Sequence, residues 1–353
     1  MTTNEWWNKP STPTGVSWVR DSMRSTPVGE RPFGKGKPVE KVRKIGSAWR
    51  KMIQSKSLGI RIVLFGVAAL AVFGAAGLCP HGECAAGDVD SLAILKAISK
   101  ADTAWSPEDS APVVDIAAGG VDSLLPEFIG WGVGERLVFS VQYGIVKAGE
   151  AVLEVRNVAE IDGKPSYYIL SDARTNDVFS VFYRVRDRFV SLMDTTDLVS
   201  LRYEKHLHEG KYKNYRFAVF DQQQHKANYD GKEIPIAPRT QDVLSAMYYA
   251  RSLPLKVGQA IAIANHTDGK NYPLVVRVLG EERITVEAGT FDCLIVEPFL
   301  RYPGIFTQKG RVKVWVTNDR YKIPVLVKSK VIIGEVSAVL TDYRLAEKFR
   351  NDD

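Results

Sequence analysis

Most of the chain beyond residue 126 alternates between apolar and polar positions, the pattern of half-buried β-strands. Leu137–Tyr143 and Ala151–Arg156 both alternate and are rich in β-branched and aromatic residues. The glycine-containing turn Gly144–Gly149 lies between them, so the pair predicts a hairpin. The same features predict further strands at Ser166–Ala173, Val178–Met193, Leu201–His208, Tyr212–Asp221, His225–Tyr229, Ala260–Ala264, Tyr272–Glu282, Glu282–Ala288, Phe291–Phe299, Lys309–Thr317, Val325–Ile332 and Glu335–Arg344.

One segment within this series has helical spacing instead. Thr240 can cap a helix, Asp242 suits its positive N-terminus, and Pro254 ends it. Its apolar stripe consists of Val243, Leu244, Met247, Ala250 and Leu253. About a dozen strands and one helix predict a mainly β fold. We expect a large antiparallel curved sheet, either a half-barrel or a sandwich, with one covering helix.

A different pattern precedes this domain. Ile62–Leu78 is an uncharged apolar run, with Lys56 and Arg61 just before it. As a helix it would be about 26 Å long, which suits either the apolar core of an export signal or a short membrane span. Both interpretations place the following domain outside the cytoplasm, in the periplasm.

The two interpretations differ in where the protein begins and whether the run is removed. If translation begins at Met52, residues 52–86 form a signal peptide, with small residues near Ala86 for cleavage. If the run is retained, it is a single-pass anchor of the inner membrane, and residues 62–78 make the membrane contact. We expect the first arrangement and keep the second as the alternative.

The remaining organisation follows from composition. Residues 1–51 predict a disordered basic arm, untranslated if Met52 is the start, and 87–125 predict a linker. The β-rich domain spans 126–347, and 348–353 form a tail. Residues 1–60 carry 12 Lys and Arg against 4 Asp and Glu, so the other 293 residues are slightly acidic although the whole chain is +6. We therefore expect no nucleic-acid partner, because the positive charge lies outside the domain.

The cysteines suggest structural roles. Cys79 and Cys84 directly follow the apolar run and are disulfide candidates in an oxidising periplasm. Cys293 alternates with apolar residues in a predicted strand, which is typical of a small, buried and inert thiol.

Several segments of the domain resemble one bacterial family. They are Gly134-Glu-Arg-Leu-Val-Phe-Ser-Val141, Ala148-Gly-Glu-Ala-Val-Leu-Glu-Val155, Thr240–Tyr249, Glu287–Glu297, Gly310–Asp319 and Ile323-Pro-Val325. With these, residues 134–345 resemble domain-of-unknown-function family 3108. The resemblance implies an exported β-rich envelope protein, and it supplies no catalytic residues. The sheet with one helix is also similar to periplasmic lipoprotein-carrier folds in architecture.

Three arginines are candidate ligand-binding residues. Arg184, Arg186 and Arg188 alternate along one predicted strand, so their guanidinium groups share a face. Such a row can hold phosphate or carboxylate through forked hydrogen bonds. The alternative is a solvated outer face whose arginines pair with Asp or Glu on neighbouring strands.

Two other sets of residues are weaker candidates. His206 and His208 share a strand face and can bind zinc where further ligands converge, but the sequence supplies no fixed third ligand. Phe139, Tyr143 and Met247 would line an apolar groove if the helix covered only part of a concave sheet. If the sheet closes on itself, these side chains belong to the core instead.

The motifs G-x-S-x-G, H-E-x-x-H and G-x-x-x-x-G-K-[ST] are all absent from the sequence. The leading hypothesis is a non-enzymatic exported envelope protein that binds or carries an amphiphile, such as lipid or lipidated cargo, without a cofactor. One alternative is a structural or interaction module with an envelope protein partner. Another is a periplasmic hydrolase whose catalytic residues are dispersed along the chain.

Overall fold

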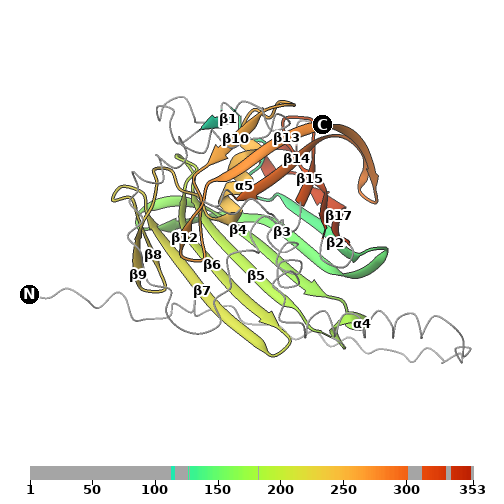
Figure 1. Cartoon of the computed structure of the whole chain (residues 1–353), viewed down its shortest axis with the longest axis horizontal. Helices are drawn as coiled ribbons and strands as arrows, with labels where there is room; N and C mark the ends of the chain where they lie inside the picture. The colour runs from blue at the N-terminus through green and yellow to red at the C-terminus, as the bar shows by residue number, and fades with distance from the viewer. Residues whose placement is uncertain are drawn as a thin grey trace, which may run out of the picture. The chain divides into compact units, whose positions relative to one another are not determined.

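The computed structural model describes residues 113–115, 126, 128–181, 183–300, 312–330 and 335–350. In these ranges fifteen strands form one sheet, antiparallel throughout except that β1 pairs in parallel with β10 (Figure 1). Its strands are β1 (Val113–Asp115), β2 (Arg136–Tyr143), β3 (Val146–Ile161), β4 (Lys164–Thr175), β5 (Arg186–Asp194), β6 (Ser200–Glu209), β7 (Tyr212–Asp221), β8 (Lys226–Tyr229), β9 (Lys232–Pro235), β10 (Ala260–Ile263), β13 (Leu274–Val286), β14 (Gly289–Leu300), β15 (Val312–Thr317), β16 (Pro324–Lys330) and β17 (Glu335–Arg344).

The remaining described elements are short. They are the helices α4 (Asp177–Ser180) and α5 (Val243–Ser252), the 3-10 helix η4 (Glu347–Phe349), and a small hairpin of β11 (His266–Thr267) and β12 (Lys270–Asn271). The expected mainly β architecture is confirmed, and most expected strands match within a few residues.

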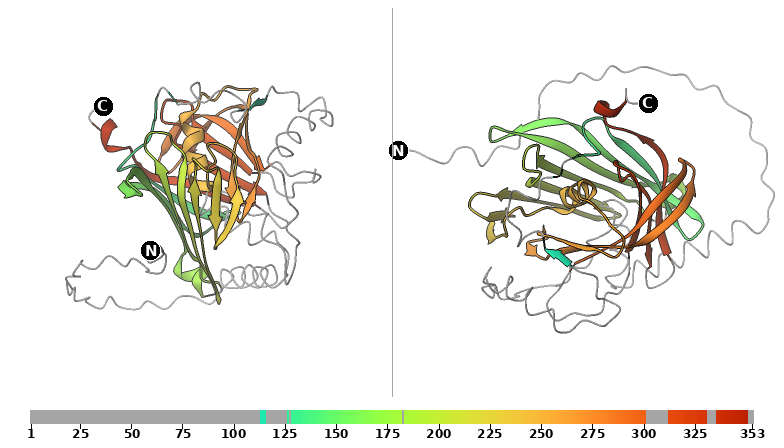
Figure 2. Two further views of the ribbon diagram at one scale, coloured as in Figure 1. Left: turned by 90° about the vertical axis from the view of Figure 1, so that its left-hand side faces the viewer. Right: turned by 90° about the horizontal axis from the view of Figure 1, so that it is seen from above.

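The sheet consists of two meanders joined through their ends. Strands β2 to β9 follow one another in space as in sequence, and so do β10 and β13 to β17. The last strand, β17, pairs with the first long strand, β2, so the two meanders form one continuous sheet. The sheet curves around α5, which lies on its concave side (Figure 2).

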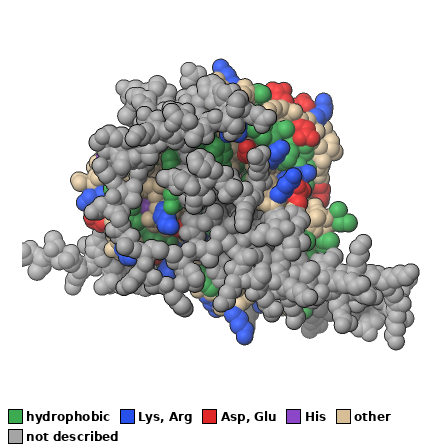
Figure 3. All heavy atoms as spheres, viewed as in Figure 1, with side chains coloured by type: hydrophobic (Ala, Val, Ile, Leu, Met, Phe, Trp, Pro, Cys, Tyr) green, Lys and Arg blue, Asp and Glu red, His purple; other side chains and the backbone are tan. Residues whose placement is uncertain are grey.

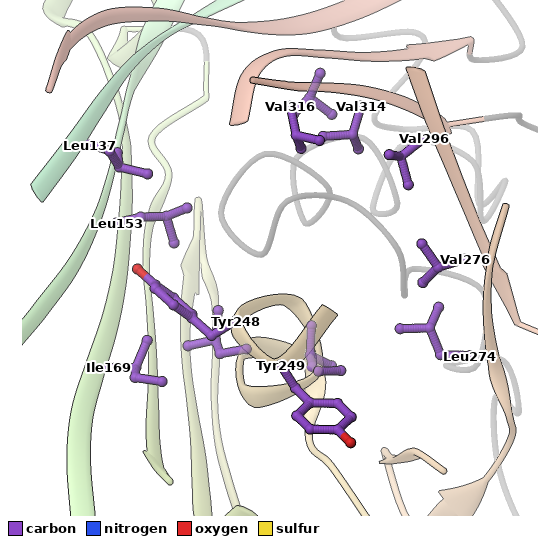
Figure 4. Packing of buried hydrophobic residues seen from close by; sticks show 14 of the residues in the cluster. Leu137, Leu153, Ile169, Tyr248, Tyr249, Leu274, Val276, Val296, Val314 and Val316 are labelled. Atoms are coloured by element: carbon purple, nitrogen blue, oxygen red, sulfur yellow. The ribbon is translucent and has the colours of Figure 1, made fainter. Parts of the chain in front are cut away.

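The expected helix is confirmed, but it buries more than the expected apolar stripe. A covering helix would bury one stripe, but α5 buries Ser245, Tyr248 and Tyr249 as well as Val243 and Leu244. The expected stripe residues Met247 and Ala250 are the more exposed ones. The reason is that α5 has sheet on more than one side: Tyr248 points toward the wall that carries Leu153 and Ile169, and Tyr249 points elsewhere (Figure 4).

The helix begins one residue after a buried carboxylate. Asp242, not Thr240, is the N-cap: its Oδ1 accepts from the N–H groups of Leu244 (2.7 Å) and Ser245 (3.0 Å). Its Oδ2 accepts from the hydroxyls of Ser191 (2.6 Å) and Ser200 (2.5 Å) on β5 and β6. Thr240 instead donates to the carbonyl of Ala237. The cap therefore joins the helix to the sheet.

The other end of α5 is joined to the chain that precedes β2. Arg251 donates two hydrogen bonds of 2.8 Å to the carboxylate of Glu135, and both side chains are buried. The indole of Trp131 donates to the carbonyl of Tyr248 (2.8 Å) and to the hydroxyl of Ser252 (2.9 Å). These bonds satisfy polar groups at the end of a helix that water does not reach.

Within the described residues β9 and β10 do not pair, and other contacts join the two meanders there. The N–H of Gln241 donates to Ala264 O, and Gln241 O accepts from the N–H of His266, each at 2.9 Å. Lys205 on β6 reaches Asp268 between β11 and β12, with 3.0 Å between Nζ and Oδ1.

Two strand predictions were wrong in detail. The expected strand Val178–Met193 is interrupted by α4, because Asn176 caps a short helical turn with its side chain. The segments expected as separate strands around Glu282 are one strand, β13, with a register shift between Val278 and Gly280. Strand β1 lies within the expected linker.

The N-terminal predictions lie outside the described residues. These are the basic arm, the signal peptide or anchor over 52–86, and the cysteine pair Cys79 and Cys84. The described part of the chain contains no helix with the length and apolarity to cross a membrane.

Removing the helix cap should destabilise the domain. Asp242→Ala leaves two helix N–H groups and two serine hydroxyls without their acceptor, and we expect a loss of about 3 kcal/mol in the free energy of unfolding. Asp242→Asn keeps the cap oxygen and should cost about 1 kcal/mol. Urea unfolding measures both, and equal stability of Asp242→Ala and the wild type would contradict the assigned role.

Candidate functional site

The predicted arginine row lies on the convex, outer face of the sheet. Along β5 and the residue pair before it, Arg184, Arg186 and Arg188 are exposed, whereas Val185 and Asp187 are buried. The alternation follows from the strand geometry, which sends successive side chains to opposite faces. The three guanidinium groups therefore point away from the core.

Cross-strand pairing gives Arg186 an unfavourable neighbour. Arg174 on β4 lies directly opposite Arg186, and Glu150 on β3 lies directly opposite Arg174. Glu150 accepts a hydrogen bond of 2.9 Å from Arg174. Within the described residues neither Arg186 nor Arg184 makes an ion pair. Like charges in directly opposite positions destabilise a sheet, so the fold keeps positive charge here at a cost.

Arg188 differs from the other two. Its Nε and Nη2 donate to Oδ2 of Asp172 on β4, at 3.0 and 2.6 Å. Arg188 therefore fits the alternative stated from the sequence, in which an arginine on a solvated face pairs with Asp or Glu on a neighbouring strand. Within the row, the arginines that make no ion pair with a described residue are Arg184 and Arg186, at the end where β5 begins.

Further cations lie at the same end. Lys211 and Lys213, in and after the turn between β6 and β7, are exposed. The N–H of Gly210 donates to Arg184 O at 2.7 Å, which places this turn beside the start of the arginine row. Figure 3 shows Lys and Arg side chains projecting from the lower margin, where the β6–β7 hairpin ends. We call Arg174, Arg184, Arg186, Lys211 and Lys213 the basic end.

The two histidines lie near the basic end but have other contacts. Nε2 of His206 lies 3.1 Å from Oε2 of Glu204, and its ring packs on Tyr215 with 4.5 Å between centroids. His208 uses its backbone N–H to donate to Oδ1 of Asp187. In the ranges that the structure describes, no group of three His, Cys, Asp or Glu side chains is placed to hold a metal ion.

Asp187 is a buried carboxylate behind the arginine row. Its Oδ1 accepts from the N–H of His208 at 2.9 Å, and its Oδ2 has no hydrogen-bond partner among the described residues. Burial raises the pKa of Asp187 to about 6, although the His208 N–H and the charge of Lys205 oppose the shift. The folded state therefore binds a proton at this carboxyl more tightly than the unfolded chain does.

The proposed groove residues are divided between core and partly buried positions. Phe139 is 1% exposed and belongs to the core, whereas Tyr143 and Met247 are half-buried. Because α5 occupies the concave side of the sheet, Phe139 is not offered to a ligand there. Cys293 is buried as well, and burial raises the pKa of its thiol to about 11, which opposes a role as nucleophile.

Sequence reasoning missed the neighbours of the row. Arg174 is on β4, Lys211 is in the turn before β7 and Lys213 is on β7, and the pairing that brings them beside β5 is not visible in the sequence. Positive charge that recurs at the ends of consecutive predicted strands was the available signal, since hairpins bring such ends together.

Asp187 makes stability depend on pH. Its folded pKa of about 6 lies above the ordinary value of 3.8, so the stabilisation is complete below about pH 4 and is lost as the pH rises through 6. Asp187→Asn should remove this dependence. We expect the stability of the wild type relative to Asp187→Asn to fall by about 2 kcal/mol between pH 4 and pH 7. Parallel unfolding curves across this range measure it, and a constant difference would contradict the assignment.

The chain matches solved structures from several bacteria. One is a β-barrel-like protein of domain of unknown function DUF1849 from Brucella abortus, with 11% identity and a TM-score of 0.46, covering 62% of this chain and 99% of its own. Another is described as a "putative exported protein" with a YmcC-like fold from Bacteroides fragilis, with 13% identity and a TM-score of 0.25, covering 62% of this chain and 100% of its own. A "putative lipoprotein" from Parabacteroides distasonis has 12% identity and a TM-score of 0.29, covering 61% of this chain and 98% of its own.

No curated protein matches the sequence. A family model described as "Protein of unknown function (DUF3108)" matches residues 138–341, which include every described strand from β3 to β16 and most of β2 and β17. The match spans more than half of the chain, as the motifs in β2, β3, α5, β14 and β15 lead one to expect. The chain therefore belongs to the DUF3108 family.

Proposed function

We propose that this chain is a non-enzymatic, exported protein of the cell envelope that binds an anionic amphiphile at the basic end of its sheet. The observation that carries the proposal is the cross-strand pair of Arg174 and Arg186, with Arg184 beside it. Glu150 already engages Arg174, so an anion at this end would neutralise Arg186 and Arg184, which have no carboxylate partner among the described residues.

The chemistry of the headgroup follows from the guanidinium group. Arginine presents a planar fork of N–H donors that matches phosphate and carboxylate oxygens in pairs. Arg186 and Arg184 have no carboxylate partner among the described residues, so their donors are available to a ligand. Exposed aliphatic side chains at the same end, Ile145, Val178 and Val181, suit the apolar part of an amphiphile.

The place of binding is the outer face because the inner face is occupied. Helix α5 lies inside the curve of the sheet, with both of its ends held by buried polar groups. Phe139 and Leu153 on β2 and β3 belong to the core. An amphiphile inserted among them would have to displace α5 and break these bonds.

Export is supported by the apolar run Ile62–Leu78 and the basic residues before it. In a periplasmic location the domain would meet anionic lipids and glycolipids of the envelope. Cleavage after the run would release the domain into the periplasm, and retention would hold it beside the inner membrane.

The test is binding of a monomeric anionic amphiphile by the full chain. Lysophosphatidylglycerol below its critical micelle concentration should bind, with lysophosphatidylcholine much weaker. Arg184→Glu combined with Arg186→Glu should weaken binding about tenfold or more, because each arginine contributes a charge-assisted hydrogen bond. Isothermal titration calorimetry measures these affinities.

The matched control is the double variant Arg156→Glu with Arg283→Glu. Both arginines are exposed, on β3 and β13, and neither belongs to the basic end. The control should bind like the wild type. If the two double variants bind equally, or if the zwitterionic lipid binds as well as the anionic one, the proposal fails.

A further inference from the structure

Three exposed aliphatic side chains lie at one end of the sheet. Ile145 is 94% exposed, Val181 is 78% exposed and Val178 is 58% exposed. Single exposed aliphatic residues are common on protein surfaces, but several together mark an interaction site. We call Ile145, Val178 and Val181 the apolar rim.

Ile145 owes its position to a two-residue turn. Tyr143 pairs with Val146, so Gly144 and Ile145 alone connect β2 to β3. Gly144 has a φ of +58°, which glycine adopts without strain at the first position of such a turn. The second position needs no apolar residue, and a side chain at a hairpin tip has little to pack against. Ile145 is therefore exposed at the outermost point of the hairpin.

The two valines are held outward by α4. The side chain of Asn176 caps this short helix by accepting from the N–H of Phe179 at 2.9 Å. Phe179 is only 8% exposed and anchors the turn against the sheet. Val178 precedes this anchor and Val181 follows the helix, and both remain in solvent. The capped turn, with Phe179 buried against the sheet, therefore presents both valines to solvent.

The hairpin tip and α4 are adjoining segments. Asn176 donates from its side chain to Lys147 O at 2.8 Å and from its backbone N–H to Ala148 O at 3.0 Å. Gly149 permits this close approach, since a Cβ there would lie 2.2 Å from Arg174 O. Figure 1 shows α4 and the tip of β2 and β3 at the same end of the sheet.

Cations flank the rim. Lys147 is exposed two residues after Ile145, and Arg184 follows Val181 by three positions. Arg186 begins the next strand. The acidic groups here are Glu150, which is engaged by Arg174, and Asp177 at the start of α4. Glu335 also lies beside the hairpin tip, where its carbonyl accepts from the N–H of Gly144 and its carboxylate lies 3.9 Å from Nζ of Lys328. Basic side chains next to exposed aliphatic ones are the composition of a surface that lies on an anionic membrane.

We infer that the apolar rim docks the domain onto the surface of an anionic lipid bilayer. The inference rests on the proposed function and names the bilayer as the source of the anionic amphiphile. Ile145, Val178 and Val181 enter the boundary between headgroups and acyl chains. The basic end meets the lipid phosphates, and the strands stand with their β2–β3 and β4–β5 ends toward the membrane.

The test compares vesicle binding by the full chain and two triple variants. The rim variant is Ile145→Ser, Val178→Ser, Val181→Ser, and the matched control is Val158→Ser, Val257→Ser, Leu279→Ser, exposed aliphatic residues outside the rim. Vesicles of phosphatidylcholine with phosphatidylglycerol should bind the wild type and the control equally. The rim variant should bind these vesicles at least about tenfold more weakly, because each serine removes apolar surface that the bilayer would otherwise bury. Cosedimentation measures binding.

The outcomes separate this inference from the proposed function. Lysophosphatidylglycerol below its critical micelle concentration should bind the rim variant more weakly than the wild type, but still in preference to lysophosphatidylcholine, since the arginines that hold its headgroup are intact. If the rim variant binds vesicles as well as the wild type, or if the wild type binds none, docking through the rim is overturned. The result with the monomeric lipid then decides the proposed function independently. Circular dichroism of each variant verifies that the fold is retained.

Discussion

The fold depends on how α5 is held inside the curved sheet by buried charges at its two ends. A helix surrounded by protein must satisfy its terminal N–H and C=O groups without water. Asp242 does this at the start and at the same time binds hydroxyls of β5 and β6. Arg251 at the other end pairs with Glu135, just before β2. Since β2 also pairs with the last strand, β17, these contacts tie the helix to both meanders.

This arrangement favours the outside of the sheet over its inside for the proposed ligand. A groove on the concave side would need α5 to leave, which would expose Asp242 and separate a buried ion pair, a costly step when one partner is left alone. The convex face carries no such constraint. At one end it combines the like-charge pair Arg174 and Arg186 with exposed aliphatic residues, features that lower stability or solubility and so point to a partner.

Much of the fold could be predicted, because a hairpin is specified by alternation and turn residues that lie close together in the sequence. The β2–β3 hairpin and β7 follow from alternation and turn glycines. Arg184, Arg186 and Arg188 lie on one face, as the period of two residues in a strand requires. The predictions that were wrong or incomplete depend on contacts between residues that are distant in the sequence. Thr240 and Asp242 are both good caps, and the bonds that Ser191 and Ser200 donate to Asp242 come from strands that the local pattern does not place beside it. The neighbour of Arg186 likewise depends on register, which the pattern of one strand does not contain.

The central claim is that ligands meet the convex basic end while α5 stays in place. Hydrogen–deuterium exchange of the full chain with and without lysophosphatidylglycerol tests it most directly. The account predicts slower exchange in peptides covering residues 143–148 and 174–188, and unchanged exchange in residues 243–252. Faster or slower exchange in the α5 peptide, with no change at the basic end, would contradict it and place the ligand inside the sheet.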